Sequence, residues 1–164
     1  MRMTIVAALA ASSILAGCSR TAEAPAQASA PGEVPITLAA GGAAVLVPVH
    51  VNGAGPYHFV LDTGATLTCI DQALAERLEL PQPVGLIGHG TTLRETGTIG
   101  LHRIDRLNVG SVSAARLTAC AIDLQRIEAA GLKADGLLGL NFLKAFKVTV
   151  DFDRKVLTLA PPGG

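Results

Sequence analysis

The pentapeptide Leu61-Asp62-Thr63-Gly64-Ala65 puts one carboxylate on a tight turn directly after an apolar segment. The residues on both sides, 57–61 and 66–70, are rich in β-branched, aromatic and aliphatic side chains and indicate two buried strands. An Asp at the end of a buried strand is costly unless it is paired or hydrogen-bonded. Gly64 then allows the backbone to approach another group closely. The turn therefore predicts a carboxylate that is presented for chemistry.

Strand-like segments occupy most of the chain beyond this turn. A turn-rich loop at residues 52–56 closes a hairpin onto the Asp62 segment, and Pro48 predicts an edge or a bulge in the preceding strand. Asp71 is a suitable N-cap for one short helix, and residues 140–146 suit one or two helical turns. The other expected strands lie at residues 44–51, 94–99, 102–109, 115–124, 147–152 and 155–159. Many short strands with one or two short helices predict an all-β domain folded as a closed or nearly closed barrel.

The N-terminus predicts export and anchoring. Residues 1–17 have a basic start, an apolar run too short to span a bilayer and a small-residue end, which is the layout of a secretory signal. Leu15-Ala16-Gly17-Cys18 resembles the lipobox of bacterial lipoproteins, which implies cleavage before Cys18 and lipidation of that residue. Ser19 resembles an outer-membrane sorting signal. An ordinary signal peptide in which Cys18 is incidental is the alternative.

Three regions follow from this pattern. Residues 1–17 are the expected signal peptide, and residues 18–34, rich in Ala and Pro, are the expected flexible tether. Residues 35–162 are long enough for one domain with its own core. We expect the mature protein to be lipid-anchored in the bacterial cell envelope, facing the periplasm.

Charge and histidine spacing argue against other classes. Thirteen basic and thirteen acidic residues give a formal net charge of zero, so composition gives no electrostatic support for nucleic-acid binding. The four histidines have no i, i+4 pair of the zinc-protease type. His50 and His58 face each other if the first hairpin has the simplest register, which leaves a metal site open. We nevertheless expect no metal and no cofactor.

Cys69 and Cys120 remain as an even pair once Cys18 is lipidated. Disulfides form readily in the periplasm, and a bridge closing so long a loop is worth about 4 kcal/mol on the chain-entropy model. Two separate buried thiols fit the sequence equally well. Neither cysteine has a histidine at a recognised catalytic spacing, so a catalytic cysteine is not expected.

The order of these parts resembles the retropepsin-like aspartic proteases, the single-domain relatives of pepsin, and especially their bacterial secreted members. Asp62-Thr63-Gly64-Ala65 and, further on, Gly136-Leu137-Leu138-Gly139 carry the resemblance, which spans residues 36–159. It implies a barrel of the retropepsin type and hydrolysis of peptide or protein substrates.

Roles follow from the resemblance position by position. Asp62 would be the catalytic aspartate, Thr63 would hydrogen-bond between two active-site loops, and Gly64 would lie close to the substrate backbone. Residues 85–98 would form a flap over the cleft. The remaining expected substrate contacts are Ala65, Gly88, His89, Gly90 and Leu137.

Peptide hydrolysis without a metal needs both an acid and a base. Two close carboxylates share one proton and supply both. The chain has a single Asp-Thr-Gly, so the second carboxylate must come from another copy of Asp62, and the resemblance implies a homodimer. A non-catalytic periplasmic β domain that binds peptides or a protein partner through the same cleft is the main alternative. A zinc-dependent hydrolase is a third reading.

Overall fold

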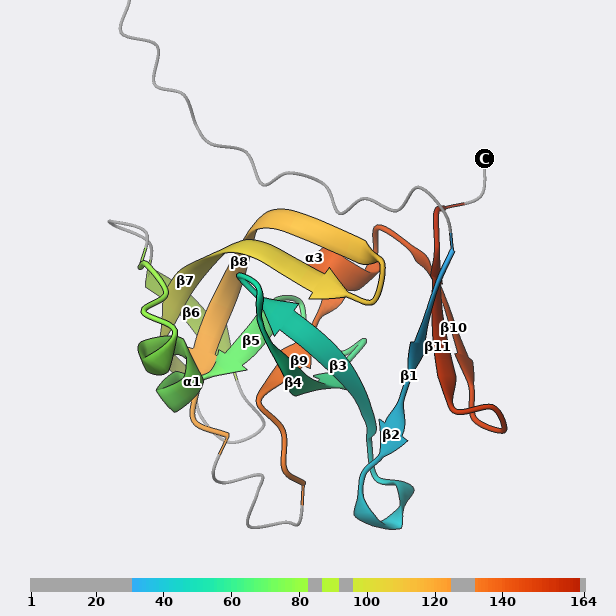
Figure 1. Ribbon diagram of the computed structural model, residues 1–164. Helices are drawn as coiled ribbons and strands as arrows, with labels where there is room; N and C mark the ends of the chain where they lie inside the picture. The colour runs from blue at the N-terminus through green and yellow to red at the C-terminus, as the bar shows by residue number, and fades with distance from the viewer. Residues whose placement is uncertain (1–30, 83–86, 92–95, 125–131, 163–164) are drawn as a thin grey trace, which may run out of the picture.

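Short β-strands and a few short helices make up the part of the chain that the computed structural model describes, residues 31–82, 87–91, 96–124 and 132–162 (Figure 1). The helical segments are the 3₁₀ turn η1 (Ala40–Gly42), α1 (Gln72–Arg77) and α3 (Leu140–Leu143). The strands are β1 (Gly32–Pro35), β2 (Thr37–Leu38), β3 (Val45–Val51), β4 (Ala54–Leu61), β5 (Thr68–Asp71), β6 (Ile87–Thr91), β7 (Thr96–Val109), β8 (Val112–Ile122), β9 (Gly136–Leu138), β10 (Lys147–Asp151) and β11 (Val156–Ala160).

Six of these strands close into a barrel. The order β3-β4-β9-β5-β8-β7 returns to its start because β7 also pairs with β3, at His50↔Asn108 and Val51↔Leu107. The interior holds fully buried aliphatic and aromatic side chains, among them Val47, Val49, Phe59, Ile70, Ile104, Leu107 and Leu117. The predicted all-β barrel with short helices is confirmed. No helix in the described ranges is both long and apolar enough to cross a membrane.

A second, three-stranded sheet, which we call the terminal sheet, stands at one side of the barrel (Figure 1). Its order is β1-β11-β10, with both pairings antiparallel. The predicted hairpin at the end of the domain is therefore present. Pairing begins at Gly32, within the segment assigned to the tether, because Gly32 and Val34 alternate inward and are buried. The predicted signal peptide and Cys18 lie outside the described residues.

Turn chemistry explains the first hairpin. Asn52 and Gly53 both have positive φ, 51° and 85°, which is the conformation that two-residue hairpin turns favour. The turn is shorter than the predicted loop, since β4 already begins at Ala54. Pro48 lies between the parts of β3 that pair with β2 and with β7, and the β3–β4 register shifts between Val49 and Val51. The predicted irregularity is confirmed.

β7 is longer than the sequence predicted. β7 runs through fourteen residues, where the sequence predicted two strands at 94–99 and 102–109. Gly100 does not interrupt it, because this residue is paired on both sides, with Ile87 of β6 and Ala121 of β8. The segment expected to form the flap, residues 85–98, includes β6 and the first residues of β7, which pair as antiparallel strands. Residues 92–95, between these strands, lie outside the described residues.

Candidate active site

The loop that carries Asp62 crosses over the end of another strand. Residues 62–67 join β4 to β5, yet these strands are not neighbours, because β9 lies between them. β9 runs parallel to β4 (Leu61↔Leu138) and antiparallel to β5 (Cys69↔Leu137). The chain segment after β9 is therefore placed directly against the Asp62 loop.

Asp62 is fixed by its own loop and by β9. Its backbone N–H donates to the carbonyl of Leu138 at 3.1 Å. The Gly64 N–H donates to Asp62 Oδ1 at 2.8 Å, and the Ala65 N–H points back to the Asp62 carbonyl at 3.4 Å. The Asp62 side chain is half-buried, while Thr63 and Gly64 are exposed. This arrangement holds a carboxylate in one place and keeps it accessible.

Gly139 allows the close contact between the loop and the end of β9. A Cβ atom at this position would lie 2.3 Å from the Leu67 carbonyl oxygen and 2.4 Å from its carbon. Any side chain would push the loop away. The absence of a side chain at Gly139 is therefore what allows the loop to pack closely against the end of β9.

Asn141 is the main brace of the loop, and sequence reasoning missed it. Its Oδ1 accepts hydrogen bonds from the N–H and the hydroxyl of Thr68, at 2.8 and 2.9 Å. Its Nδ2 donates to the carbonyl of Thr118 in β8 at 2.8 Å. The Thr68 hydroxyl also accepts from the Gly139 N–H at 3.2 Å, and Thr68 is fully buried. The only local signal was a polar residue beginning a helix directly after an apolar strand.

Backbone bonds complete this brace. The Leu140 N–H donates to the Ala65 carbonyl at 2.8 Å, and the Asn141 N–H donates to the Thr66 carbonyl at 3.1 Å. The first turn of α3 is thus hydrogen-bonded along the Asp62 loop. The loop is held by three separate parts of the barrel, namely β9, α3 and, through Asn141, β8.

The other expected site residues fall into two groups. Ala65 lies in the Asp62 loop, and Leu137 lies in β9, paired with Val60 of β4. Gly88, His89 and Gly90 belong to β6, which pairs with β7 in the predicted flap hairpin. Their backbone pairing is described, and the side chains of residues 83–99 lie outside the described set.

Cys69 and Cys120 occupy facing positions of the parallel strands β5 and β8. The structure joins them by a disulfide with a Cα–Cα distance of 4.4 Å across a sequence separation of 51 residues. Both are nearly buried. Of the two alternatives left open by the sequence, the structure contains the bridge. Cys69 directly follows Thr68, so the bridge and the Asn141 brace link the same two strands.

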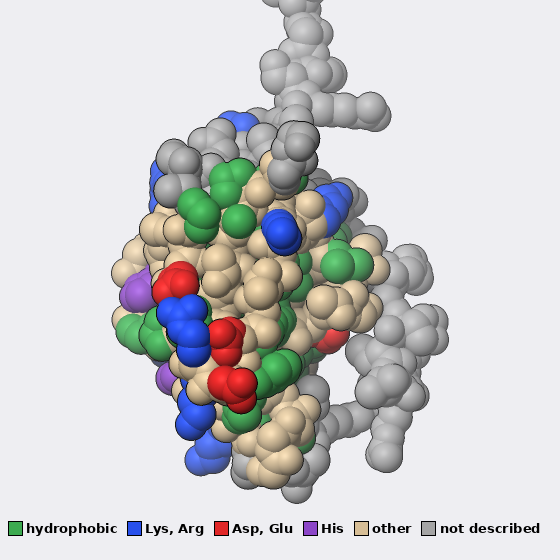
Figure 2. Space-filling model, turned by 90° about the vertical axis from the view of Figure 1, so that its right-hand side faces the viewer, with side chains coloured by type: hydrophobic (Ala, Val, Ile, Leu, Met, Phe, Trp, Pro, Cys, Tyr) green, Lys and Arg blue, Asp and Glu red, His purple; other side chains and the backbone are tan. Residues whose placement is uncertain are grey.

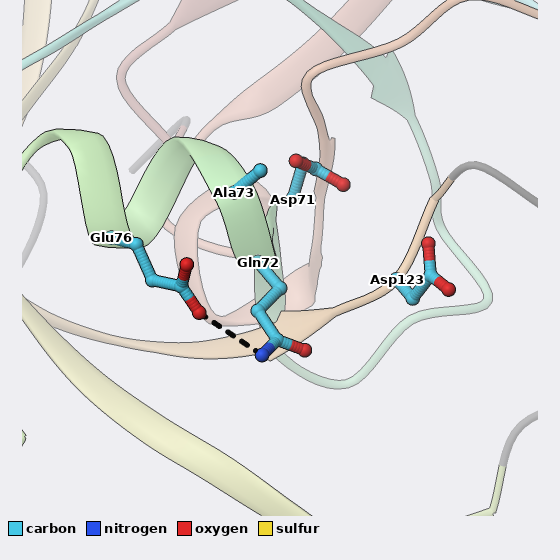
Figure 3. Close-up of a pocket in the computed structure, with 5 residues that line it drawn as sticks. All are labelled: Asp71, Gln72, Ala73, Glu76 and Asp123. Carbon is cyan, nitrogen blue, oxygen red and sulfur yellow. Dashed lines mark hydrogen bonds between the residues drawn. The ribbon is translucent and has the colours of Figure 1, made fainter.

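A hollow of about 250 Å³ lies at the opposite end of β5 (Figure 3). It is lined by Asp71, Gln72, Ala73, Glu76 and Asp123. Asp71 caps α1 as predicted, because its Oδ1 accepts from the Leu74 N–H at 3.2 Å. Its Oδ2 accepts from the Leu124 N–H at 3.2 Å. Both oxygens are therefore engaged in holding backbone.

The positions of His50 and His58 do not support a metal site. The register places His58 opposite Pro48, and His50 lies opposite Asn108 of β7, so the two histidines do not face each other across the hairpin. The turn is shorter than the predicted loop, because Val51 pairs with Ala54, and this shifts the register away from the one that pairs His50 with His58. Within the described ranges, no three His, Cys, Asp or Glu side chains are grouped so as to hold a metal ion.

Comparison with known proteins points to one family. The sequence profile of the aspartyl protease family matches residues 47–142, from β3 to α3. A retropepsin-like aspartic protease from Rickettsia conorii has a similar structure, with a TM-score of 0.54 and 19% identity over 80% of this chain and 94% of that chain. The retroviral protease-like domain of Ddi1 from Leishmania major matches with a TM-score of 0.45 and 18% identity over 71% and 87% of the two chains. No protein with a curated description matches the sequence.

Proposed function

We propose that this chain, which belongs to the aspartyl protease family, is an endopeptidase whose active site forms between two copies of the chain. Each copy supplies one Asp62. The observation that carries the proposal is the geometry of the Asp62 loop, in which a braced backbone presents an accessible carboxylate that accepts a hydrogen bond from the Gly64 N–H.

Other aspartates differ from Asp62 in their sequence context or in the number of hydrogen bonds that they accept. Asp135 accepts the backbone N–H of His58 at 2.8 Å, and Asp151 accepts that of Arg154 at 2.8 Å. Neither is followed by Thr-Gly or Ser-Gly. Asp71 has both carboxylate oxygens bonded to backbone amides. Asp62 is therefore the carboxylate best suited to chemistry.

The proposed reaction uses the two Asp62 carboxylates as one pair that shares a proton. The unprotonated carboxylate takes a proton from water as the water oxygen attacks the carbonyl carbon of the peptide. The protonated carboxyl gives its proton to the carbonyl oxygen. In the second step, the carboxyl that took a proton from water gives it to the amide nitrogen, while the other carboxylate takes back a proton from one hydroxyl of the tetrahedral intermediate. The C–N bond breaks to release a free amine and a free carboxylic acid, and the pair again holds one shared proton.

The remaining parts of the loop take supporting roles in this proposal. Thr63 is exposed in the single chain, which leaves it available to hydrogen-bond with the loop of the second copy. Gly64 and Ala65 would line the cleft beneath the substrate. The β6–β7 hairpin, with Gly88, His89 and Gly90, would cover it.

We further propose that the protein acts in the bacterial envelope, anchored through a lipid on Cys18. Two features support this location. The N-terminal segment has the lipobox Leu15-Ala16-Gly17-Cys18. The Cys69–Cys120 disulfide is a bond that persists in oxidising compartments such as the periplasm and is rare in the cytosol.

Replacement of Asp62 by Asn tests the catalytic proposal. The substitution keeps the size of the side chain and removes its charge, so hydrolysis of unfolded proteins should be abolished at acid and neutral pH. Sedimentation of the full chain in detergent should still show a dimer. Asp71→Asn is the matched control, and it should retain activity.

Two results would overturn the proposal. Peptidase activity that persists in Asp62→Asn would show that Asp62 is not the catalytic carboxylate. A wild-type chain that stays monomeric at high concentration and cleaves no unfolded substrate would favour the peptide-binding domain instead.

A further inference from the structure

β5 carries the end of the Asp62 loop into the barrel, and its backbone pairing is short. The strand has four residues, Thr68–Asp71, and it pairs with β9 at two positions and with β8 at four. Its first residue, Thr68, is the one that hydrogen-bonds to Asn141 through both its N–H and its hydroxyl. Because so few ladder bonds hold the start of β5, its position depends on side-chain links to the neighbouring elements.

Two such links lie next to each other between β5 and β8. The Asn141 amide joins the Thr68 N–H to the Thr118 carbonyl, at 2.8 Å in each bond. The disulfide joins the next residue of β5, Cys69, to the facing residue of β8, Cys120. The oxygen and the nitrogen of one amide are a fixed distance apart, so both hydrogen bonds keep good geometry only at one strand spacing. The disulfide fixes that spacing covalently.

The bridge also contacts the Asp62 loop itself. The Cys69 sulfur lies 3.6 Å from the carbonyl oxygen of Leu67, the last residue of the loop. The same carbonyl oxygen faces Gly139, where a Cβ atom would come within 2.3 Å of it. The end of the loop is therefore in contact with both the disulfide and the end of β9. Cys69 is 7% exposed and Cys120 is 4% exposed, so the bond is shielded from reductants once the protein has folded.

We propose that the Cys69–Cys120 disulfide positions the Asp62 loop, so that the site reaches full activity only after this bond has formed. The inference rests on the proposed function, since Asp62 is the group whose position matters. The two cysteines touch no reacting atom and act through Thr68 and Asn141 as positioning residues. The activity of the chain then depends on its surroundings, and it is low while the cysteines are thiols and full after their oxidation.

Formation of the bond is a two-electron oxidation, and the oxidant in this proposal is another disulfide. One cysteine loses its proton, and the thiolate attacks a sulfur of the oxidant, which breaks the S–S bond of the oxidant and gives a mixed disulfide. The second cysteine, also as a thiolate, then displaces the remaining sulfur of the oxidant. The Cys69–Cys120 bond has formed, and the oxidant leaves as two thiols that carry the two electrons and the two protons.

The expected effect on catalysis is moderate, because the loop has other supports. The bond from the Asp62 N–H to Leu138 and the backbone bonds from the first turn of α3 do not pass through β8. A misplacement of about 1 Å costs about 10²-fold in rate, and partial loosening should cost less. We expect kcat to be about tenfold lower without the bond. KM should change by less than about twofold, because alignment of the carboxylates matters most in the transition state.

Replacement of both cysteines by valine removes the bond and leaves apolar side chains that suit a strand at the two positions. In the full chain, Cys69→Val combined with Cys120→Val should show this lower kcat at a nearly unchanged KM. Circular dichroism confirms that the variant and the wild type are folded to the same extent. Wild-type kcat in the folded valine variant overturns the inference.

Refolding connects the effect to the redox state. Wild type and the valine variant are unfolded with a thiol reductant and refolded either with that reductant or with a small-molecule disulfide. The wild type should recover full kcat only with the disulfide, and the valine variant should behave the same in both conditions. Full kcat in a wild type whose Cys69 and Cys120 are both labelled as free thiols contradicts the inference. If neither the reduced wild type nor the valine variant folds, the bond supports the whole barrel, and a specific role at the loop is refuted.

Hydrogen exchange reports on the loop without any proteolysis. The amides that form the brace belong to Thr68, Gly139, Leu140 and Asn141. In the valine variant they should exchange about tenfold faster or more, while the amides of the terminal sheet keep their wild-type rates. Equal acceleration throughout the barrel would show a general loss of stability. That result, or unchanged exchange at the brace, refutes the positioning role.

The terminal sheet provides a matched control. Figure 2 looks onto the side of the molecule where this sheet stands, and basic and acidic side chains lie next to one another there. Arg154, in the turn between β10 and β11, forms an exposed ion pair with Glu33 of β1 at 3.3 Å. Glu33→Gln removes this link and leaves β5 and β8 unchanged, so exchange at the brace should equal that of the wild type. Faster exchange there would show that the loop responds to any lost link, which contradicts a specific role of the disulfide.

The two proposals fail in different ways. If Asp62→Asn keeps wild-type activity, the proposed function fails, while hydrogen exchange still decides whether the disulfide holds the loop. If Asp62 is required but the valine variant has wild-type kcat and wild-type exchange, only the role of the disulfide fails.

Discussion

Two aspartates lie before and at the end of β5, and their carboxylates are used in opposite ways: Asp62 lies in the loop that leads into this strand, and Asp71 is its last residue. At the far end, both oxygens of Asp71 accept backbone N–H groups, from Leu74 and Leu124. In the loop before β5, the backbone around Asp62 is braced by other residues, and within the described chain the carboxylate itself accepts only the Gly64 N–H. Asp71 holds the structure together through both of its carboxylate oxygens. The position of Asp62, in contrast, is fixed by backbone hydrogen bonds that do not involve its carboxylate.

Of the substitutions that test this difference between Asp62 and Asp71, Asp62→Ala should have the largest effect. We expect catalysis to fall by about 10³-fold or more, because the pair loses an acid–base partner. Stability should change by less than about 1 kcal/mol, since the lost bond is local and partly exposed. Urea unfolding and cleavage rates measure the two quantities. A large loss of stability would show that Asp62 is structural, like Asp71.

Gly139→Ala should disturb the brace instead of the carboxylate. The new Cβ meets the Leu67 backbone at 2.3 Å, so the loop or β9 must move. We expect a loss of about 3 kcal/mol in the free energy of unfolding, together with reduced activity in the folded fraction. Gly41→Ala is a comparison, since its Cβ meets nothing within 4 Å and only its positive φ of 72° opposes the change. Equal costs in the two variants would refute the close-contact explanation.

Asp71→Ala should have the opposite effects of Asp62→Ala, with lower stability and unchanged activity. The helix cap is lost and the Leu124 amide loses its acceptor, so unfolding should become easier by about 2 kcal/mol. Activity per folded molecule should remain at the wild-type level. Denaturation followed by far-ultraviolet circular dichroism, with active-site titration, separates the two effects. Lost activity in a fully folded protein would show that the reaction depends on Asp71, which would contradict the assignment to Asp62.

Glu76→Ala should produce the smallest change. Glu76 lines the same hollow as Asp71, but it accepts a side-chain hydrogen bond from Gln72 at 3.1 Å on the exposed face of α1. Such helix-surface pairs contribute about 0.5 kcal/mol. Thermal unfolding should therefore resemble that of the wild type. A shift comparable to that of Asp71→Ala would mean that the hollow as a whole, and not the Asp71 cap, provides the stability.

Local signals in the sequence predicted much of this arrangement. The Asp62 turn, the Asn52-Gly53 hairpin, the Asp71 cap and the terminal hairpin each depend on residues close together in the chain. Turn preference, capping and alternation report such features directly. The number of short strands predicted a closed or nearly closed barrel, and the family resemblance added its retropepsin type and the likeness of the Asp62 loop to a catalytic loop.

Features that depend on distant residues escaped prediction. Asn141 lies 73 residues from Thr68, and no periodicity connects the two. The insertion of β9 between β4 and β5 and the pairing of β1 with β11 follow from how the barrel and the terminal sheet close. The Cys69–Cys120 bridge depended on β5 and β8 being neighbours. Each became visible only once strand order was known.

Mixed dimers test the central claim most directly, because they ask whether one site needs two copies of Asp62. Wild-type chain and Asp62→Asn chain are allowed to exchange subunits in equal amounts, and cleavage is measured at constant total protein. If each site is built from both chains, only dimers with two Asp62 residues are active, and the rate should be about one quarter of that of undiluted wild type. A rate of about one half would show that each chain carries a complete site of its own and would contradict the account.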